Sequence, residues 1–246
     1  MDLGIAGRRA AVAAASEGLG FATAAALRDA GVAVAICGRD AAKVNAAANR
    51  IGAVAIVLDV GSDAGGRSFV EQAAAALGGP IDILVPNAGG PPMGGSEIVD
   101  ADSVTAALEL NLHSTIGMCA AAIPQMRAQR WGRIVAITSI TARQPIPAIA
   151  LSNITRPAVT GYLKTLALAV ASDGVTVNSV QPGLHATARM GGADPATLAP
   201  PAGVPAGEWG RAEDFGRVAA FLCSESARYV TGVGLPIDGG MMSALQ

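Results

Sequence analysis

The sequence predicts an α/β fold, a single doubly wound domain in which a mainly parallel seven-stranded sheet is flanked by helices. Short apolar runs alternate with longer alanine-rich segments of helical spacing from one end of the chain to the other. This alternation is typical of βαβ units, whose right-handed crossovers cover both faces of a parallel sheet with helices. We expect one domain over residues 1–246, because no internal repeat or charged linker divides the chain.

The expected elements follow one another in regular order. Apolar runs predict strands over residues 9–15, 32–37, 53–58, 81–86, 132–138, 175–180 and 232–237. Apolar residues at helical spacing predict helices over residues 20–30, 41–51, 66–77, 101–130 and 210–224. The segment 184–209 is rich in Pro, Gly and Ala and has no clear element, so we expect it to form a lid over a binding site.

The composition argues against several kinds of partner. The formal net charge is −2 and no basic run occurs, so neither nucleic acid nor a membrane is an expected partner. Cys37, Cys119 and Cys223 are scattered in apolar contexts without CxxC spacing, which indicates reduced thiols and no metal site. No signal peptide and no segment of membrane-spanning length is recognised, so a cytoplasmic protein is expected.

A glycine-rich turn follows the first expected strand. The stretch AAASEGLG, residues 13–20, leads from the strand into a helix. Gly18 and Gly20 allow the backbone to turn tightly against a pyrophosphate, whose charge a helix N-terminus stabilises. Turns of this kind also occur for packing reasons, so the turn alone does not decide between a phosphate-binding role and a packing role.

Several motifs along the chain resemble, in order and spacing, those of the short-chain dehydrogenase/reductase family. They are the glycine turn 13–20, PNAG at 86–89, Asn111 in an expected helix, Ser139 in GRIVAITSI, VNSVQPGLHAT at 177–187 and YVTGVGLPIDGG at 229–240. The resemblance covers nearly the whole chain and is to the 3-oxoacyl-carrier-protein-reductase-like branch. It implies a Rossmann-type domain that binds a nicotinamide cofactor and acts on a small carbonyl compound.

The resemblance also implies which residues lie against the cofactor. They are Ala14, Ser16, Gly18, Leu19, Gly20, Arg39, Asp59, Val60, Asn87, Ala88, Gly89, Arg156, Pro182, Gly183, His185 and Thr187. Two motifs depart mildly from the family pattern, since Ala13 and Ala14 replace Thr and Gly, and Pro86 replaces Asn. A methyl group at position 14 narrows the room for the pyrophosphate, so weaker cofactor binding is expected.

The end of the second expected strand bears on the choice of cofactor. An acidic residue there would bind the ribose 2′-hydroxyl of NAD, whereas an arginine accommodates the 2′-phosphate of NADP. The strand ends in Cys37 and Gly38 and is followed by Arg39, which favours NADP. Glu17 in the glycine turn favours NAD. Arg39 would not bind the 2′-phosphate if it paired with Asp40, so NAD stays the alternative.

The catalytic tyrosine and lysine of the family are missing. The family places Tyr thirteen residues after the catalytic Ser and Lys four residues later, and here those positions hold Ser152 and Arg156. The only tyrosines are Tyr162 and Tyr229, and neither precedes a lysine by four residues. The chain therefore resembles an atypical member that lacks the YxxxK motif.

The remaining candidates for the chemistry are a catalytic set of Ser139, Ser152, Arg156 and Asn111. A serine hydroxyl is far less acidic than a phenol, so Ser152 would pass on a proton from water, and Arg156 would hold the ribose or supply charge near a developing oxyanion. Alternatively, the guanidinium of Arg156 would bind an acidic substrate group. Pro157 disfavours helical geometry at Arg156, which predicts a late or kinked helix capped by Thr155 or Asn153.

Two further residues are candidates for contact with the substrate. His185 titrates in the range that suits an acid, although it would equally be a loop residue without this role. Gln144 lies in the loop before the altered helix.

Three classes of function are open to this sequence. The first is an NADP-dependent oxidoreductase that reduces a ketone or 3-oxoacyl-type carbonyl with an altered proton-donor site. The second is a non-redox cyclase, isomerase or lyase on the same fold, and the third is a non-catalytic NADP-binding protein. Relatives assemble as homotetramers, so a homotetramer or homodimer is expected.

Overall fold

The computed structural model describes residues 2–192 and 194–244 and contains a seven-stranded sheet in the order β3-β2-β1-β4-β5-β6-β7. Every pair of neighbouring strands is parallel, which confirms the predicted fold class. The strands are β1 (Arg9–Val12), β2 (Ala33–Gly38), β3 (Val54–Val57), β4 (Ile83–Val85), β5 (Gly132–Ile137), β6 (Val175–Pro182) and β7 (Gly234–Ile237). Most are shorter than predicted, because the apolar runs continue into the loops at the strand ends.

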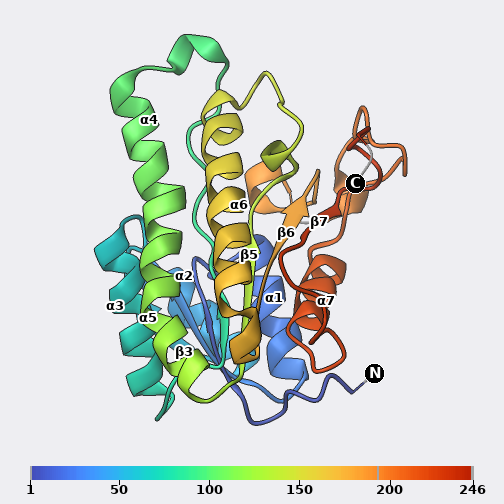
Figure 1. Ribbon diagram of the computed structural model, residues 1–246. Helices are drawn as coiled ribbons and strands as arrows, with labels where there is room; N and C mark the ends of the chain where they lie inside the picture. The colour runs from blue at the N-terminus through green and yellow to red at the C-terminus, as the bar shows by residue number, and fades with distance from the viewer. Residues whose placement is uncertain (1, 193, 245–246) are drawn as a thin grey trace.

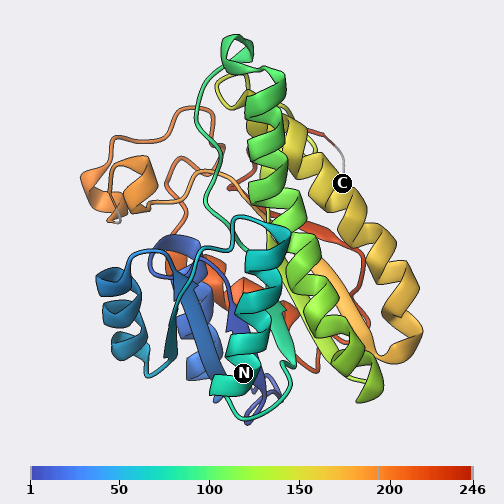
Figure 2. The same cartoon turned by 90° about the vertical axis from the view of Figure 1, so that its left-hand side faces the viewer.

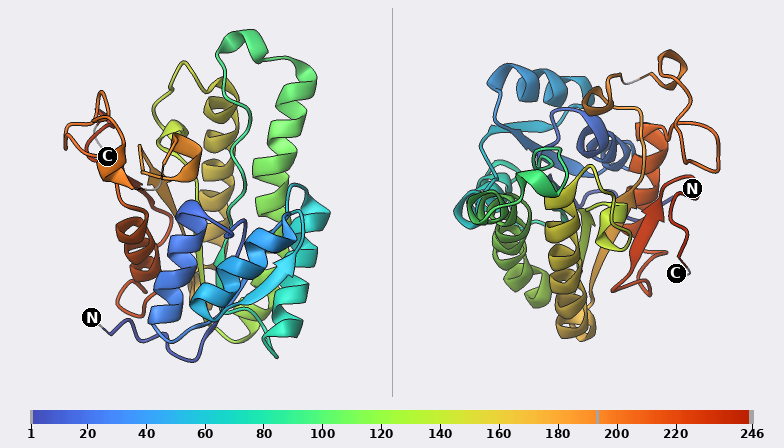
Figure 3. Two further views of the ribbon diagram at one scale, coloured as in Figure 1. Left: turned by 180° about the vertical axis from the view of Figure 1, so that it is seen from behind. Right: turned by 90° about the horizontal axis from the view of Figure 1, so that it is seen from above.

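Helices cover both faces of the sheet, as Figures 1 and 3 show. The α-helices are α1 (Gly18–Asp29), α2 (Ala41–Ile51), α3 (Asp63–Ala76), α4 (Ala101–Leu108), α5 (Ser114–Ala128), α6 (Ala150–Val170) and α7 (Ala212–Leu222). Side chains of α3, α5 and α6 form one buried apolar cluster, in which Phe69 and Met118 are fully buried. Side chains of α1, α2 and α7 form a second cluster on the other face, around Leu27 and Phe215. The core is therefore two apolar layers separated by the sheet.

Short helical turns connect these elements. They are the π-helical turn η2 (Glu109–His113) between α4 and α5, and the 3₁₀ turns η1 (Ser96–Ile98), η3 (Ile140–Ala142), η4 (Ala171–Asp173), η5 (Ala188–Met190) and η6 (Pro195–Thr197). In Figure 2, the continuous stretch from α4 to α5 runs beside α6. By length and composition, the stretch Ala101–Ala128 could cross a membrane, but core helices of soluble proteins pass the same test, and 44% of its most apolar window is buried.

Helix α6 begins earlier than predicted. It runs without interruption from Ala150 through Pro157, so the expected late start near Arg156 is wrong. Neither expected cap acts as one: the Thr155 hydroxyl donates to Asn111 Oδ1, and Asn153 exchanges hydrogen bonds with the backbone of Ile146. A proline costs the helix one backbone hydrogen bond, and the burial of one helix face against the sheet outweighs that loss.

The order of the strands reverses at β1 and β4. Chain connections leave these two neighbouring strands in opposite directions, and ligands of open α/β sheets bind at the carboxyl ends of the strands at such a point. The glycine turn follows β1, and Asn87 follows β4. The two segments therefore meet at this switch point.

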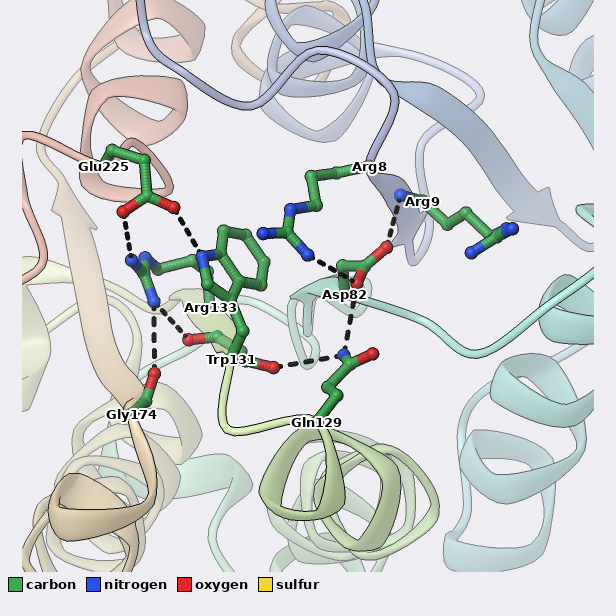
Figure 4. A network of polar contacts seen from close by, with 9 residues as sticks. Arg8, Arg9, Asp82, Gln129, Trp131, Arg133, Gly174 and Glu225 are labelled. Carbon is green, nitrogen blue, oxygen red and sulfur yellow. Dashed lines mark hydrogen bonds and ion pairs between the residues drawn. The ribbon is translucent and has the colours of Figure 1, made fainter.

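A polar network lies at the opposite end of the sheet, where the strands begin (Figure 4). The Trp131 ring lies between two guanidinium groups, that of Arg8 at 3.8 Å and that of Arg133 at 4.4 Å from its centre. Glu225 accepts a hydrogen bond from Trp131 Nε1 and pairs with Arg133, and Asp82 pairs with Arg8 at 3.3 Å. These contacts join the amino ends of β1, β4 and β5 to the segment after α7.

Candidate active site

The glycine turn has the backbone shape of a phosphate-binding turn. Ala14 (φ 45°) and Gly18 (φ 64°) both lie in the left-handed region. Gly20 has no room for a side chain, because a Cβ there would lie 2.8 Å from both Ala14 O and Asn87 Nδ2. No side chain caps the start of α1, and its first turn contains no acidic residue, so backbone N–H groups there are available to an anion. These features fit the diphosphate of a dinucleotide.

The turn is held by the segment after β4. Asn87 Nδ2 donates to the carbonyl oxygens of Ala13 (3.2 Å) and Ala14 (3.1 Å), which ties the PNAG motif to the glycine turn. Ala14 replaces a glycine in the left-handed conformation, where a methyl group adds strain. On the far side, a methyl group added at Gly18 would lie 3.8 Å from Thr187 Cγ2. The structure thus brings together predicted cofactor residues from the segments that follow β1, β4 and β6.

Charged side chains surround the end of β2, where the second ribose is expected. Arg39 pairs with Asp59 at 3.9 Å, and both side chains are exposed. Arg39 does not use Asp40, whose carboxylate caps α2 by accepting from Lys43 N. Glu17 pairs with Lys43 at 3.4 Å, and both of these side chains are exposed as well. Exposed pairs of this kind are weak, and Arg39 remains available to a phosphate.

The two candidate serines lie on either side of one threonine. Ser139 follows β5 and caps η3, its Oγ accepting from Thr141 N at 3.1 Å. Ser152, in the first turn of α6, has its Oγ 3.1 Å from Thr141 Oγ1. Thr141 and Ser152 are both buried. The sequence reasoning missed Thr141, although its place two residues after Ser139 would have been a reason to consider it.

Arg156 is buried at the carboxyl end of β5. Only 8% of the residue is exposed, Nη1 donates to Ile137 O over a long 3.4 Å, and Nε has no hydrogen-bond partner. Burial, and secondarily the charge of Arg189, lowers the pKa of the Arg156 guanidinium to about 10. Arg189 is a second residue that the sequence reasoning missed, since no motif connects it to Arg156.

Asn111 lies in the π-helical turn and joins two parts of the site. Its Nδ2 donates to Gly89 O at 3.3 Å, and its Oδ1 accepts from Thr155 Oγ1 at 3.1 Å. Single π-helical turns inside α-helices are frequent at functional sites. Here the turn places the Asn111 amide between the loop after β4 and helix α6. Its partner on α6, Thr155, is the residue before Arg156.

The remaining predicted residues lie at the edge of the site. Gln144 binds the C-terminal segment, where its Oε1 accepts from Ser243 N at 3.0 Å. His185 packs edge-to-face on Phe215, with ring centres 5.2 Å apart, and its Nδ1 lies 3.4 Å from Gly183 O. Within the described parts of the chain, no hydrogen bond connects His185 to Ser139 or Ser152. Burial lowers the pKa of His185.

His185 stands at the base of the predicted lid. Backbone hydrogen bonds join Ala186 N to Gly210 O and Gly210 N to Leu184 O, so the segment 184–209 leaves and returns at one point. A pocket of about 170 Å³ opens beside this base, between His185, Trp209, Phe215 and Asp238. Figures 2 and 3 show the segment, in orange, outside the helical layers.

Comparisons with known proteins agree with this geometry. Residues 13–242 match the family model described as enoyl-(acyl carrier protein) reductase. The human dehydrogenase/reductase SDR family member 4 is 32% identical over 98% of this chain and 90% of its own length. The 3-oxoacyl-(acyl-carrier-protein) reductase FabG of Escherichia coli is 32% identical over 96% of this chain and 97% of its own.

Solved structures show the same fold. The L-sorbose reductase of Gluconobacter frateurii, complexed with NADPH and L-sorbose, superposes with a TM-score of 0.91 at 27% identity over the full length of both chains. A short-chain oxidoreductase of Pseudomonas aeruginosa PAO1, described as containing an atypical catalytic centre and bound to NADPH, has a TM-score of 0.89 at 30% identity over 98% of this chain and 99% of its own.

Proposed function

Because this chain belongs to the short-chain dehydrogenase/reductase family, we propose that it is an NADPH-dependent reductase of a small carbonyl compound whose proton donor differs from the family's tyrosine. One observation carries the proposal: Ser139, Thr141 and Ser152 form a hydrogen-bonded cluster at the end of β5, beside the buried Arg156 and at the same end of the sheet as a glycine turn that fits a diphosphate. A non-catalytic binding protein would not need this cluster.

Carbonyl reduction adds a hydride to the carbon and a proton to the oxygen, and NADPH supplies the hydride when it is bound. The role proposed for the Ser139 hydroxyl is to donate a hydrogen bond to the carbonyl oxygen. The Ser152 hydroxyl, held by Thr141 Oγ1, relays a proton from water, since its own pKa is too high for it to act as a free acid near pH 7. Arg156 supplies positive charge near the developing oxyanion.

The cofactor residues follow the same proposal. The glycine turn and Thr187 hold the diphosphate, Asn87, Ala88 and Gly89 line the path to the nicotinamide, and Arg39 binds the 2′-phosphate. NADPH is the preferred cofactor, because Arg39 lies at the end of β2 and its pair with Asp59 is exposed and weak. We propose a cytoplasmic protein that assembles as a homotetramer or homodimer.

Turnover assays test the proposal directly. Purified protein with NADPH is expected to reduce at least one member of a panel of ketones, 3-oxoacyl thioesters, quinones and imines, followed by loss of nicotinamide absorbance. NADPH is expected to bind more tightly than NADH. Binding of NADPH without turnover of any member would contradict the proposal, and product formation without nicotinamide oxidation would point to the cyclase, isomerase or lyase alternative.

The double variant Ser152→Tyr with Arg156→Lys isolates the missing proton donor. Restoring a phenol beside an ammonium supplies an acid with a pKa suited to neutral pH. General acid catalysis is worth about 10²–10⁴-fold, so we expect kcat for the best ketone to rise by at least about tenfold. The matched control is Ser152→Phe with Arg156→Lys, which has the same bulk without the hydroxyl and is expected to show no gain. Equal rates for the two variants would refute the assignment.

A further inference from the structure

Two guanidinium groups from distant parts of the chain lie on segments that the loop after β4 connects. Arg156 lies on α6, and the exposed Arg189 lies on η5, at the start of the predicted lid. Asn111 joins this loop at Gly89 to Thr155, the residue before Arg156. Arg189 lies against the backbone of Gly90, where any side chain would collide with its guanidinium, and its Nη2 donates to Pro91 O at 3.3 Å. Arg189 lies near enough for its charge to lower the pKa of Arg156.

Neither arginine has an acidic partner within the described parts of the chain. None of the ion pairs there includes Arg156 or Arg189. Arg133 provides the comparison: it is also buried, but it pairs with Glu225 at 3.6 Å and donates to three backbone carbonyls. A buried cation is ordinarily paired, because its desolvation is costly. The Arg156 site therefore has positive charge and a buried Nε–H donor that no group of residues 2–192 or 194–244 accepts.

We infer that Arg156 and Arg189 together bind a carboxylate of the substrate, so that the reduced compound is an oxo acid. This inference rests on the proposed function, because it names the class of carbonyl compound. Planar guanidinium groups present paired N–H donors that match the two oxygens of a carboxylate, which a lysine ammonium does not. Arg156 lies one helical turn after Ser152, so a carboxylate held there lies close to the group that would protonate the ketone oxygen.

The diphosphate of the cofactor is the other anion that could occupy this place. It already has a site of its own, since the uncapped start of α1 and the glycine turn offer backbone N–H donors to a diphosphate. Arg39, at the end of β2, is available to the 2′-phosphate. An anion between Arg156 and Arg189 is therefore assigned to the substrate.

The experiment compares acids with their own esters. The probes are 2-, 3- and 4-oxopentanoate and the methyl ester of each, assayed with NADPH for kcat and KM, alongside calorimetric titration of the protein–NADP⁺ complex with each acid. The variants are Arg189→Ala, Arg189→Lys and Arg156→Lys. Arg217→Ala removes an exposed arginine that pairs with Asp214 on α7 and is the matched control.

We expect kcat/KM for at least one acid to exceed that for its ester by about 10- to 100-fold, the size of a charge-assisted pair of hydrogen bonds. Arg189→Ala is expected to remove most of this preference, through KM more than kcat. Arg189→Lys is expected to restore part of it, and Arg156→Lys to reduce it because the fork is lost. Arg217→Ala is expected to preserve the preference.

Two results would overturn the inference. The first is equal use of acids and esters by the unaltered protein. The second is a rise in the Kd of NADPH on Arg189→Ala that accounts for the whole loss of activity, which would assign the anion to the cofactor. The proposed function fails separately: if acids bind the NADP⁺ complex and Arg189→Ala abolishes that binding, but no compound is reduced, the carboxylate site stands without the reductase.

Discussion

At the scale of single residues, the replacement of a lysine by Arg156 changes both chemistry and stability. An arginine stays charged near neutral pH, so it cannot take up and release protons as the reaction proceeds. Its guanidinium is nevertheless buried with an unpartnered Nε. Functional sites often retain groups that cost stability, and the role proposed for Arg156 would explain why this buried cation is retained.

The variant Arg156→Met tests that cost. The pKa of the guanidinium is lowered to about 10 in the folded protein, so the folded state disfavours the cation relative to the unfolded chain, whose pKa is higher. The cost is fully present below about pH 10 and disappears as pH rises above it. We expect Arg156→Met to raise the free energy of unfolding in urea at pH 7.5 by about 1–3 kcal/mol, and to abolish turnover. Exposed Arg217→Met should change stability by less than about 0.5 kcal/mol. A fall in stability would show that the packing of Arg156 outweighs its desolvation.

At the scale of elements, glycines set how closely the helices approach one another. A Cβ at Gly117 of α5 would collide with Asp63 O of α3, and a Cβ at Gly66 of α3 would collide with Ser114 O of α5. Gly216 of α7 meets Ala22 O of α1 in the same way. The alanine-rich helices therefore pack backbone against backbone on both faces of the sheet, which explains how a chain with 3% aromatic residues fills its core.

Two glycine substitutions separate close packing from helix propensity. Gly117→Ala must separate α3 from α5, so we expect it to lower the free energy of unfolding by about 1–3 kcal/mol. Gly161, on α6, has no atom within 4 Å of an added Cβ. Gly161→Ala is therefore expected to raise stability by about 0.5–1 kcal/mol through helix propensity alone. Denaturant unfolding of both variants checks the pair, and changes of the same sign would contradict the packing explanation.

The base of the predicted lid is expected to respond to pH. Burial lowers the pKa of His185 in the folded state, despite the opposing effects of Gly183 O and Asp238, so the unfolded chain binds a proton more readily. Stability is then full above the ordinary histidine pKa of about 6.5 and falls as pH decreases below it. We expect the Tm of His185→Gln to depend less on pH between about 7 and 5 than that of the unaltered protein. His113→Gln, at a half-buried histidine that pairs with Glu109, is the comparison, and equal slopes for both variants would refute the assignment.

At the scale of the whole molecule, the two ends of the sheet have different tasks. The carboxyl ends carry the glycine turn, the two serines and Arg156, whose buried Nε has no hydrogen-bond partner. The amino ends carry the network around Trp131, where both arginines that contact the ring also pair with carboxylates. A network of paired charges stabilises the fold, whereas the donor of Arg156 is available to a ligand.

Removal of the Trp131 ring tests this division. Trp131→Ala loses the stacking of Arg8 and Arg133 and the hydrogen bond to Glu225, so we expect a loss of about 2–4 kcal/mol in the free energy of unfolding. Because the ring lies at the end of the sheet opposite to the glycine turn, the Kd of NADPH should change by less than about twofold at a temperature where the variant is folded. A large loss of NADPH affinity would show that the two ends are coupled.

Predictability from sequence differed between fold and site. The order and type of the elements followed from apolar spacing, which is a local signal, and the strand ends were less accurate because apolar runs continue into loops. Ser139, Ser152 and Arg156 were identified from their spacing to known motifs. Thr141 and Arg189 were missed, since each matters through a contact with a distant residue. Thr141 contacts Ser152, 11 residues away, and Arg189 contacts Pro91, 98 residues away.

The sequence by itself determined that this chain forms a doubly wound parallel sheet, that it carries a glycine turn and that a serine and an arginine stand in place of the family's tyrosine and lysine. Only the tertiary structure decided that α6 continues through Pro157, that Thr141 joins the two serines and that Arg156 is buried without an acidic partner among the described residues. The physical reason is that local spacing sets the elements, whereas burial, pairing and charge compensation depend on which distant segments the sheet brings together.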